Sequence, residues 1–173
     1  MEQPKNNLKI IADKKNARMI LPNMLTLIGV CIGLTSIRFA LDGKFEFAII
    51  AIILAALIDG LDGRIARLIK GTSKVGKELD SLTDMISFGV APAFIMYFWK
   101  LNTLGRFGWL VCLIYVICVA LRLARFNINS NQEPSWRDNF FEGVPSPAGG
   151  ILVLTPLIIS LTNFDYISIN YNI

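Results

Sequence analysis

The sequence contains no histidine, and only 17% of its 173 residues are charged. Without an imidazole side chain, acid–base chemistry in this chain has to use carboxylates or another group. The three cysteines (Cys31, Cys112 and Cys118) lie singly within apolar stretches, at no spacing typical of a metal site. We interpret them as core or lipid-facing residues, and not as a zinc site or a disulfide framework.

Apolar residues, in contrast, make up 54% of the chain, and the mean hydropathy is +0.55. They are gathered into five blocks, at residues 19–41, 45–58, 85–101, 107–123 and 147–164. If the second block continues through Asp59 and Asp62, each block approaches the roughly 17–25 residues that a helix needs to cross a bilayer. Hydrocarbon cannot hydrate backbone groups, so these blocks should be helical. The sequence predicts an all-α integral membrane protein, a polytopic transmembrane helix bundle with five visible spans.

The basic residues predict an orientation in the membrane. Thirteen of the seventeen Lys and Arg residues lie in three segments, at residues 5–18, 64–77 and 122–137. Cytoplasmic segments are enriched in basic residues, so we expect these three, and the N-terminus, to be cytoplasmic.

Four aspartates stand out in the stretch "DGLDGRIARLIKGTSKVGKELDSLTD", residues 59–84. At about 100° per residue, Asp59 and Asp62 share one half of a helix surface, and Asp80 and Asp84 share a narrow stripe on the next helix. The short polar turn between them favours an antiparallel pair. We therefore predict that four carboxylates converge near the cytoplasmic boundary.

Clustered carboxylates in a low dielectric favour bound cations, because they cannot all remain ionised and unpaired. An all-oxygen ligand set suits Mg²⁺ or Mn²⁺ better than Zn²⁺. Two such ions would share four carboxylates, an arrangement common in phosphoryl transfer. Small residues at positions 63, 66 and 76 would let a bulky ligand approach the helices closely, and Arg67 can pair with a phosphate.

Other interpretations of the same residues are a solvated helix end, helix packing through small residues, or an ion path. A divalent-cation transporter would carry polar residues through several helices. Here the aspartates are confined to one end of one helix pair, which argues against a transporter.

The pattern Asp-x2-Asp-Gly-x2-Ala-Arg-x8-Gly-x3-Asp-x3-Asp resembles the signature of the CDP-alcohol phosphatidyltransferases, with all eight positions matching. The resemblance implies a six-helix membrane enzyme, usually a homodimer, with two Mg²⁺ or Mn²⁺ ions. It also implies transfer of a phosphatidyl group from a CDP-linked lipid to an alcohol, with release of CMP.

The resemblance further implies roles for individual residues. The predicted metal ligands are Asp59, Asp62, Asp80 and Asp84, and Asp84 is also the predicted general base. The residues expected to bind the CDP-lipid in the signature are Gly63, Ala66, Arg67 and Gly76. The stretch "LPNMLT", residues 21–26, suggests Asn23 and Thr26 as nucleotide contacts, although Pro-Asn there equally fits an ordinary helix N-terminus.

The acceptor alcohol is suggested by three further stretches: "SFGVAPAF" (87–94), "LRLARFN" (121–127) and "FEGVPSPAGG" (141–150). Together they resemble the bacterial and archaeal phosphatidylserine synthases of this superfamily, which implies CDP-diacylglycerol and L-serine as substrates. Arg122 and Arg125 would bind an anionic group of the acceptor, or would only complement a helix dipole. Glycerol 3-phosphate and inositol or its phosphate stay open as acceptors, and a catalytically inactive lipid-binding relative is a further alternative.

The predicted organisation has three parts. Residues 1–18 form a basic juxtamembrane segment, either a short amphipathic helix on the membrane surface or a frayed tail. Residues 19–164 form the transmembrane catalytic domain, in which Gly29 and Gly33 are expected to pack helices of one chain. Residues 165–173 form a C-terminal tail too short for the sixth span, which suggests truncation, a short natural member or a removed helix.

Overall fold

A computed structural model of the chain describes residues 4–69, 74–129 and 143–170. Within these ranges all regular structure is helical, which confirms the predicted all-α class. The elements are α1 (Pro4–Leu41), α2 (Phe45–Ile69), α3 (Lys74–Asp84), the π-helical η1 (Met85–Val90), α4 (Ala91–Trp99), the 3₁₀ turn η2 (Leu101–Leu104), α5 (Arg106–Asn129) and α6 (Ser146–Asn170).

Three helical stretches in the described part are long and apolar enough to cross a membrane: Asn23–Leu41, Val75–Trp99 and Arg106–Ile128. The stretch Ser146–Thr162 is apolar but shorter. Helix α2 has 25 residues, but it carries Asp59 and Asp62 in its second half. The membrane helix bundle is confirmed, whereas the spans predicted for α2 and α6 stay predictions.

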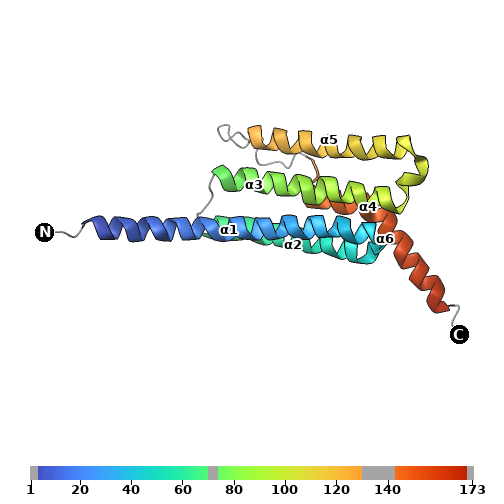
Figure 1. Cartoon of the computed structure of the whole chain (residues 1–173), viewed down its shortest axis with the longest axis horizontal. Coiled ribbons are helices and arrows are strands. Elements are labelled where there is room, and N and C mark those ends of the chain that lie inside the picture. The colour runs from blue at the N-terminus through green and yellow to red at the C-terminus, as the bar shows by residue number, and fades with distance from the viewer. Residues whose placement is uncertain (1–3, 70–73, 130–142, 171–173) are drawn as a thin grey trace.

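Helices α1 to α5 lie side by side along the long axis of the molecule, with α5 on one side and α1 and α2 on the other, whereas the C-terminal part of α6 runs obliquely away from them (Figure 1). A tight turn joins α1 to α2. In it the N–H of Lys44 donates to the carbonyl of Phe39 (2.9 Å), and the N–H of Gly43 donates to that of Ala40 (3.1 Å). Gly43 has φ = 74°, a conformation that glycine adopts without the Cβ penalty. This turn sends α2 back alongside α1.

The N-terminal part of α1 differs from both alternatives that the sequence offered. Residues 4–18 form neither a separate amphipathic helix nor a frayed tail, because α1 is continuous from Pro4 to Leu41. The predicted helix start near Pro22 is also wrong. An interior proline removes one backbone hydrogen bond, but the residues before it contain no glycine and several good helix formers, which favour continuation of the helix.

A π-helical turn follows Asp84 directly and joins α3 to α4 in one continuous rod. The N–H of Ala91 donates to the carbonyl of Ile86, five residues back, which is the hydrogen-bond spacing of a π-helix. The hydroxyl of Tyr115 on α5 donates to the carbonyl of Phe88 in this turn (2.8 Å). Such turns are rare and are often found at functional sites. The sequence analysis did not anticipate this one.

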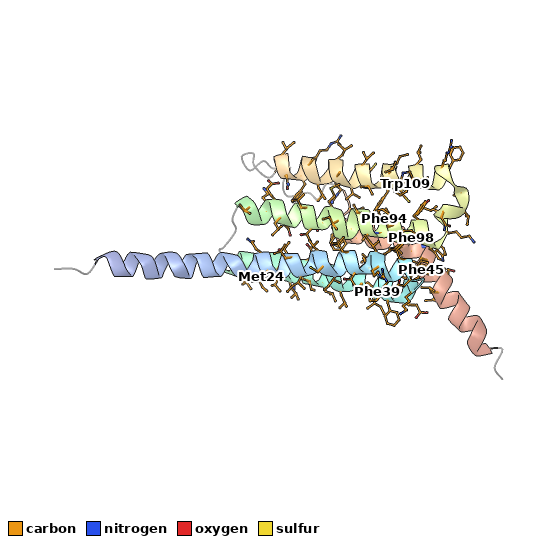
Figure 2. The ribbon with its side chains drawn as sticks, viewed as in Figure 1. Met24, Phe39, Phe45, Phe94, Phe98 and Trp109 are labelled. Carbon is orange, nitrogen blue, oxygen red and sulfur yellow. The ribbon has the colours of Figure 1, made fainter. Side chains whose placement is uncertain are left out.

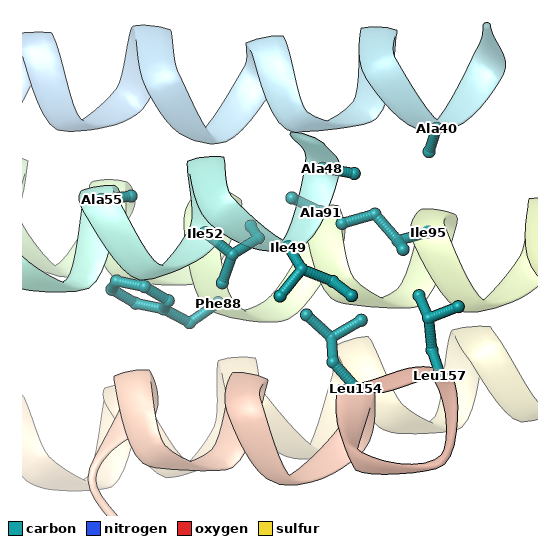
Figure 3. Close-up of a cluster of buried hydrophobic side chains, with 10 residues drawn as sticks. All are labelled: Ala40, Ala48, Ile49, Ile52, Ala55, Phe88, Ala91, Ile95, Leu154 and Leu157. Atoms are coloured by element: carbon teal, nitrogen blue, oxygen red, sulfur yellow. The ribbon is translucent and has the colours of Figure 1, made fainter. Parts of the chain in front are cut away.

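The π-helical turn lies at the centre of the bundle, where its Ser87, Phe88 and Gly89 are buried. Two helices approach it through glycines. A Cβ added to Gly33 of α1 would lie 3.0 Å from the Cα of Ser87, and one added to Gly150 of α6 would lie 3.3 Å from the Cα of Phe88. The apolar core beside it is built from α1, α2, η1, α4 and α6 (Figure 3). Gly33 therefore packs within the chain, as expected from the sequence.

Replacing Gly33 by alanine is expected to destabilise the bundle by about 1–3 kcal/mol, the usual cost of overpacking a core. The added Cβ would lie 2.9 Å from the Cβ of Ser87, which is fully buried. Thermal unfolding in detergent measures the effect. Gly60→Ala is the matched control, since nothing lies within 4 Å of its added Cβ. Equal unfolding temperatures for the two variants would contradict the close α1–η1 packing.

Aromatic side chains gather at one end of the bundle, whereas Met24 lies toward the other end (Figure 2). Trp109 contacts Phe94 and Tyr97, with ring centroids 5.9 and 5.4 Å apart, and Phe39 contacts Phe47 at 5.8 Å. Aromatic residues are enriched at membrane–water interfaces. This end is thus suited to one interface, and the polar residues described next lie at the end marked by Met24.

Candidate active site

Carboxylates from α2 and α3 come together beside α1. Asp59, Asp62 and Asp80 each contribute one carboxylate oxygen to a cluster in which these atoms lie within 4.8 Å of one another. The carboxyl groups of Asp84 and Asp59 lie within hydrogen-bonding distance. The helical period accounts for the arrangement, because positions i and i+3 on α2, and i and i+4 on α3, share a face. The structure thus brings all four predicted aspartates into one site.

Helix α1 supports this site through a buried hydrogen bond. The Thr26 hydroxyl donates to Oδ2 of Asp62 (2.9 Å), and both side chains are almost fully buried. The nucleotide contact suggested for Thr26 from the sequence stays a prediction, and in this structure its hydroxyl orients a carboxylate of the cluster. Asn23, the other residue suggested from the same stretch, is half-buried and lies one turn earlier on α1.

The cluster has the composition and spacing of a divalent-cation site. Two oxygens bound to one Mg²⁺ at about 2.1 Å can be at most roughly 4.2 Å apart, so a spacing of 4.8 Å requires only small side-chain rotations. Oδ1 of Asp62 and Oδ1 of Asp84 are buried and have no hydrogen-bond partner. Buried acceptors of this kind are normally satisfied, and a cation would satisfy them while offsetting the repulsion between neighbouring carboxylates. The residues fit Mg²⁺ or Mn²⁺.

The structure describes the surroundings of the remaining signature residues only in part. A Cβ added to Gly63 would have nothing within 4 Å, so there is open space beside α2 at this point. Gly76 lies on α3, half-buried, one turn before Asp80. Ala66 and Arg67 are on α2, but their side chains lie outside the part of the chain that the structure describes.

The two arginines of α5 are placed differently. Arg122 is half-buried, and its Nη1 donates to the Ser146 hydroxyl at the start of α6 (2.8 Å). Ser146 in turn lies close to the Asp84 carboxylate. Arg125, one turn later, has an exposed side chain. Arg122 therefore lies near the aspartate cluster, and its Nε is buried without a partner.

Ser146 is the site residue that the sequence analysis missed. It lies within the stretch "FEGVPSPAGG", of which only the resemblance was noted. A signal was present, because a serine between two prolines at the start of an apolar block is typical of a helix N-terminus. Sequence alone gave no reason to place that N-terminus beside Asp84, 62 positions earlier in the chain.

Comparison with known families agrees with this geometry. Residues 19–171 match the family described as CDP-alcohol phosphatidyltransferase. The chain belongs to this family. The match covers every described residue of the cluster and of the Arg122–Ser146 pair, and the resemblance noted from the sequence is confirmed.

Individual members of the CDP-alcohol phosphatidyltransferase family are also similar to the chain. It is 46% identical over 144 residues to a protein of Mycobacterium leprae (strain TN), covering 82% of this chain and 48% of that one. For a Helicobacter pylori (strain 26695) protein the identity is 42% over 139 residues, covering 80% and 57%. For a Bacillus subtilis (strain 168) protein it is 36% over 134 residues, covering 78% and 73%.

All three relatives bear the name CDP-diacylglycerol–serine O-phosphatidyltransferase. The chain spans about half the length of the first two. Family membership and apolar helices together make the chain an integral membrane protein of the phosphatidyltransferase type.

Proposed function

We propose that the protein transfers the phosphatidyl group of CDP-diacylglycerol to L-serine in a metal-dependent reaction, giving phosphatidylserine and CMP. The observation that carries the proposal is the cluster of four aspartates near the Arg122–Ser146 pair, in a chain whose relatives named above carry out this transfer according to their names. The carboxylates of the cluster would hold the metal cations to which the pyrophosphate binds. The arginine supplies a cation for an anionic acceptor.

Four carboxylates serve the CDP-lipid side of the reaction. Asp59, Asp62, Asp80 and Asp84 would hold the two Mg²⁺ or Mn²⁺ ions, whose charge would offset that of the pyrophosphate and of the departing CMP. Thr26 orients Asp62 for this task. The open space beside Gly63 leaves room for the nucleotide, and we assign Asn23, Ala66, Arg67 and Gly76 to the same pocket.

Asp84 also serves the acceptor side. Its carboxylate takes the proton from the serine hydroxyl as the hydroxyl oxygen attacks the lipid-proximal phosphorus. A new P–O bond to serine forms while the P–O bond to CMP breaks, and the electron pair of that bond leaves with CMP. A carboxylate has two oxygens, so Asp84 can contact a metal ion and still accept a proton from the substrate.

Arg122 is assigned to the serine carboxylate. Because a hydrogen bond to a charged group contributes about 1.5–3 kcal/mol, Arg122→Gln is expected to raise the KM for serine roughly 10–100-fold. The KM for serine is measured from steady-state CMP release at saturating CDP-diacylglycerol. Arg106→Gln, at the opposite end of α5, is the control. An unchanged KM would contradict the assignment.

Arg125 stays a second predicted contact of the acceptor. The variant Arg125→Gln in the same assay tests this prediction.

A second candidate within the family uses glycerol 3-phosphate or inositol (phosphate) as the acceptor. An acceptor with its own phosphate adds charge that a single half-buried arginine would only partly offset. We therefore favour serine. The transporter alternative is not supported by any described polar path through the apolar helices.

The orientation and the assembly also belong to this proposal. We assign the active site and the N-terminus to the cytoplasmic face of a prokaryotic inner or plasma membrane, because the basic segments favour that side. Cysteine labelling from either side of sealed vesicles tests this. The homodimer implied by the resemblance stays a prediction, which cross-linking in native membranes tests.

The deciding experiment is CMP release by purified protein in detergent with CDP-diacylglycerol and Mg²⁺ or Mn²⁺. L-serine, glycerol 3-phosphate and inositol are each offered as the acceptor. Release that depends on serine would establish the proposed reaction. Release with another acceptor would retain the family and overturn the choice of serine. No release from protein that binds the CDP-lipid would overturn the proposed activity of this chain.

A further inference from the structure

The backbone carbonyl of Phe88 lacks the donor that a regular α-helix would give it. The residue four positions later is Pro92, which has no backbone N–H. Both residues are almost fully buried, so solvent does not replace the missing donor, and buried carbonyls are normally paired. A proline can also kink or end a helix, so its presence alone does not predict a π-helical turn. The Phe88 carbonyl therefore needs a donor other than the regular helical one.

Tyr115 of α5 supplies such a donor. Its hydroxyl lies 2.8 Å from the Phe88 oxygen, and the hydroxyl must donate because a carbonyl can only accept. One turn earlier on the same face of α5, the Cys112 thiol donates to the carbonyl of Ala93 (3.4 Å). One face of α5 thus holds the two carbonyls on either side of Pro92.

The π-helical turn determines how α3 is rotated relative to α4. Asp84 has helical backbone angles (φ −56°, ψ −46°) and is followed directly by the turn, so no loop separates it from Phe88. A π-helical turn holds one residue more than an α-helical turn, which changes the relative rotation of the flanking helices by about 100°. Loss of the turn would therefore rotate Asp80 and Asp84 away from the carboxylates of α2.

We infer that Tyr115 is a positioning residue that keeps the π-helical turn formed and thereby holds the carboxylates of α3 against those of α2. Helix α3 has only 11 residues, too few to be stable in isolation, so its orientation depends on the rod into which it continues. Tyr115 acts through the backbone of this rod. The inference rests on the proposed function, in which these carboxylates hold the metal ions.

The test compares Tyr115→Phe, which removes the hydroxyl and retains the ring, with Tyr97→Phe as the matched control. Tyr97 packs against Trp109 (ring centroids 5.4 Å apart), and its hydroxyl makes no hydrogen bond to any residue that the structure describes. We expect the Mn²⁺ concentration for half-maximal CMP release to rise at least fivefold in Tyr115→Phe, because displaced carboxylates bind the ions less tightly. In Tyr97→Phe it should stay within twofold of the wild type.

Hydrogen exchange measures the stability of the turn itself, without metal or substrate. Exchange of the backbone amides of residues 85–91, followed by mass spectrometry in detergent, should be at least fivefold faster in Tyr115→Phe and unchanged in Tyr97→Phe. Unchanged exchange in Tyr115→Phe would overturn the inference whether or not the protein turns over any acceptor. Faster exchange with an unchanged Mn²⁺ dependence would also overturn it, since Tyr115 would then support only the fold.

A direct measurement of Mn²⁺ binding separates failure of the inference from failure of the proposed function. If the wild type releases no CMP with any acceptor, the two variants are compared by their dissociation constants for Mn²⁺. These are obtained from the electron paramagnetic resonance signal of the free ion. An affinity at least fivefold weaker in Tyr115→Phe would support the inference even though the proposed activity had failed. A wild type that binds no Mn²⁺ would overturn both.

Discussion

Asp84→Asn is expected to lower serine-dependent CMP release by about 10²–10⁴-fold, the usual contribution of a positioned general base. The amide has nearly the shape of the carboxylate but cannot accept the proton of the serine hydroxyl. Because the amide and the carboxylate have nearly the same volume, we expect the substitution to leave the packing around residue 84 largely intact. The measurement is kcat at saturating CDP-diacylglycerol and serine, with thermal unfolding to show that the variant folds.

Asp42→Asn is the matched control for that substitution. Asp42 pairs with Arg38 at 3.4 Å on the surface of the α1–α2 turn, and exposed pairs of this kind contribute about 0–1 kcal/mol. It should retain kcat within twofold. If Asp84→Asn kept a tenth or more of the wild-type rate, another group would be the base and the assigned role of Asp84 would be wrong.

Removing divalent cations is expected to abolish CMP release, and adding Mg²⁺ or Mn²⁺ should restore it. The clustered oxygens of Asp59, Asp62 and Asp80 provide the physical reason. Bound Mn²⁺ should also raise the unfolding temperature, because it binds the folded cluster and offsets the mutual repulsion of the carboxylates. Chelation followed by titration of each metal, with activity and thermal unfolding measured in parallel, checks both effects.

Two substitutions are expected to weaken metal binding by different amounts. Asp62→Asn removes a proposed ligand and should raise the Mn²⁺ concentration for half-maximal activity at least 100-fold. Thr26→Val removes only the hydrogen bond that orients Asp62, and losses of this kind typically cost 10–100-fold in metal affinity. Activity that survives chelation, or an Asp62→Asn variant with unchanged Mn²⁺ dependence, would contradict a metal site at this cluster.

The residues that could be predicted from sequence are those whose placement follows from local periodicity. Helical geometry alone puts Asp59 with Asp62, and Asp80 with Asp84, on shared faces. The short polar segment between α2 and α3 limits how far apart those faces can lie. Apolar blocks near the thickness of a bilayer similarly require helices. The family followed from the same stretch of sequence, because its signature is local.

The helix boundaries were less predictable. α1 continues through Pro22, since a proline costs one hydrogen bond and does not by itself end a helix whose neighbours favour it. The π-helical turn after Asp84 has no sequence signature that we could identify. Its backbone is stabilised by partners distant in the chain, such as Tyr115 on α5, and by the glycines that allow α1 and α6 to approach it.

The sequence by itself determined the class of the protein, its membrane helices and the four carboxylates, because all of these depend on residue type and on spacing within a helix or an adjacent pair. Only the tertiary structure decided what surrounds the carboxylates. It placed the Thr26 hydroxyl on Asp62, separated the half-buried Arg122 from the exposed Arg125, and brought Arg122 into contact with Ser146. These contacts join α1 to α2 and α5 to α6, and their distances are set by how whole helices pack, which no local pattern encodes.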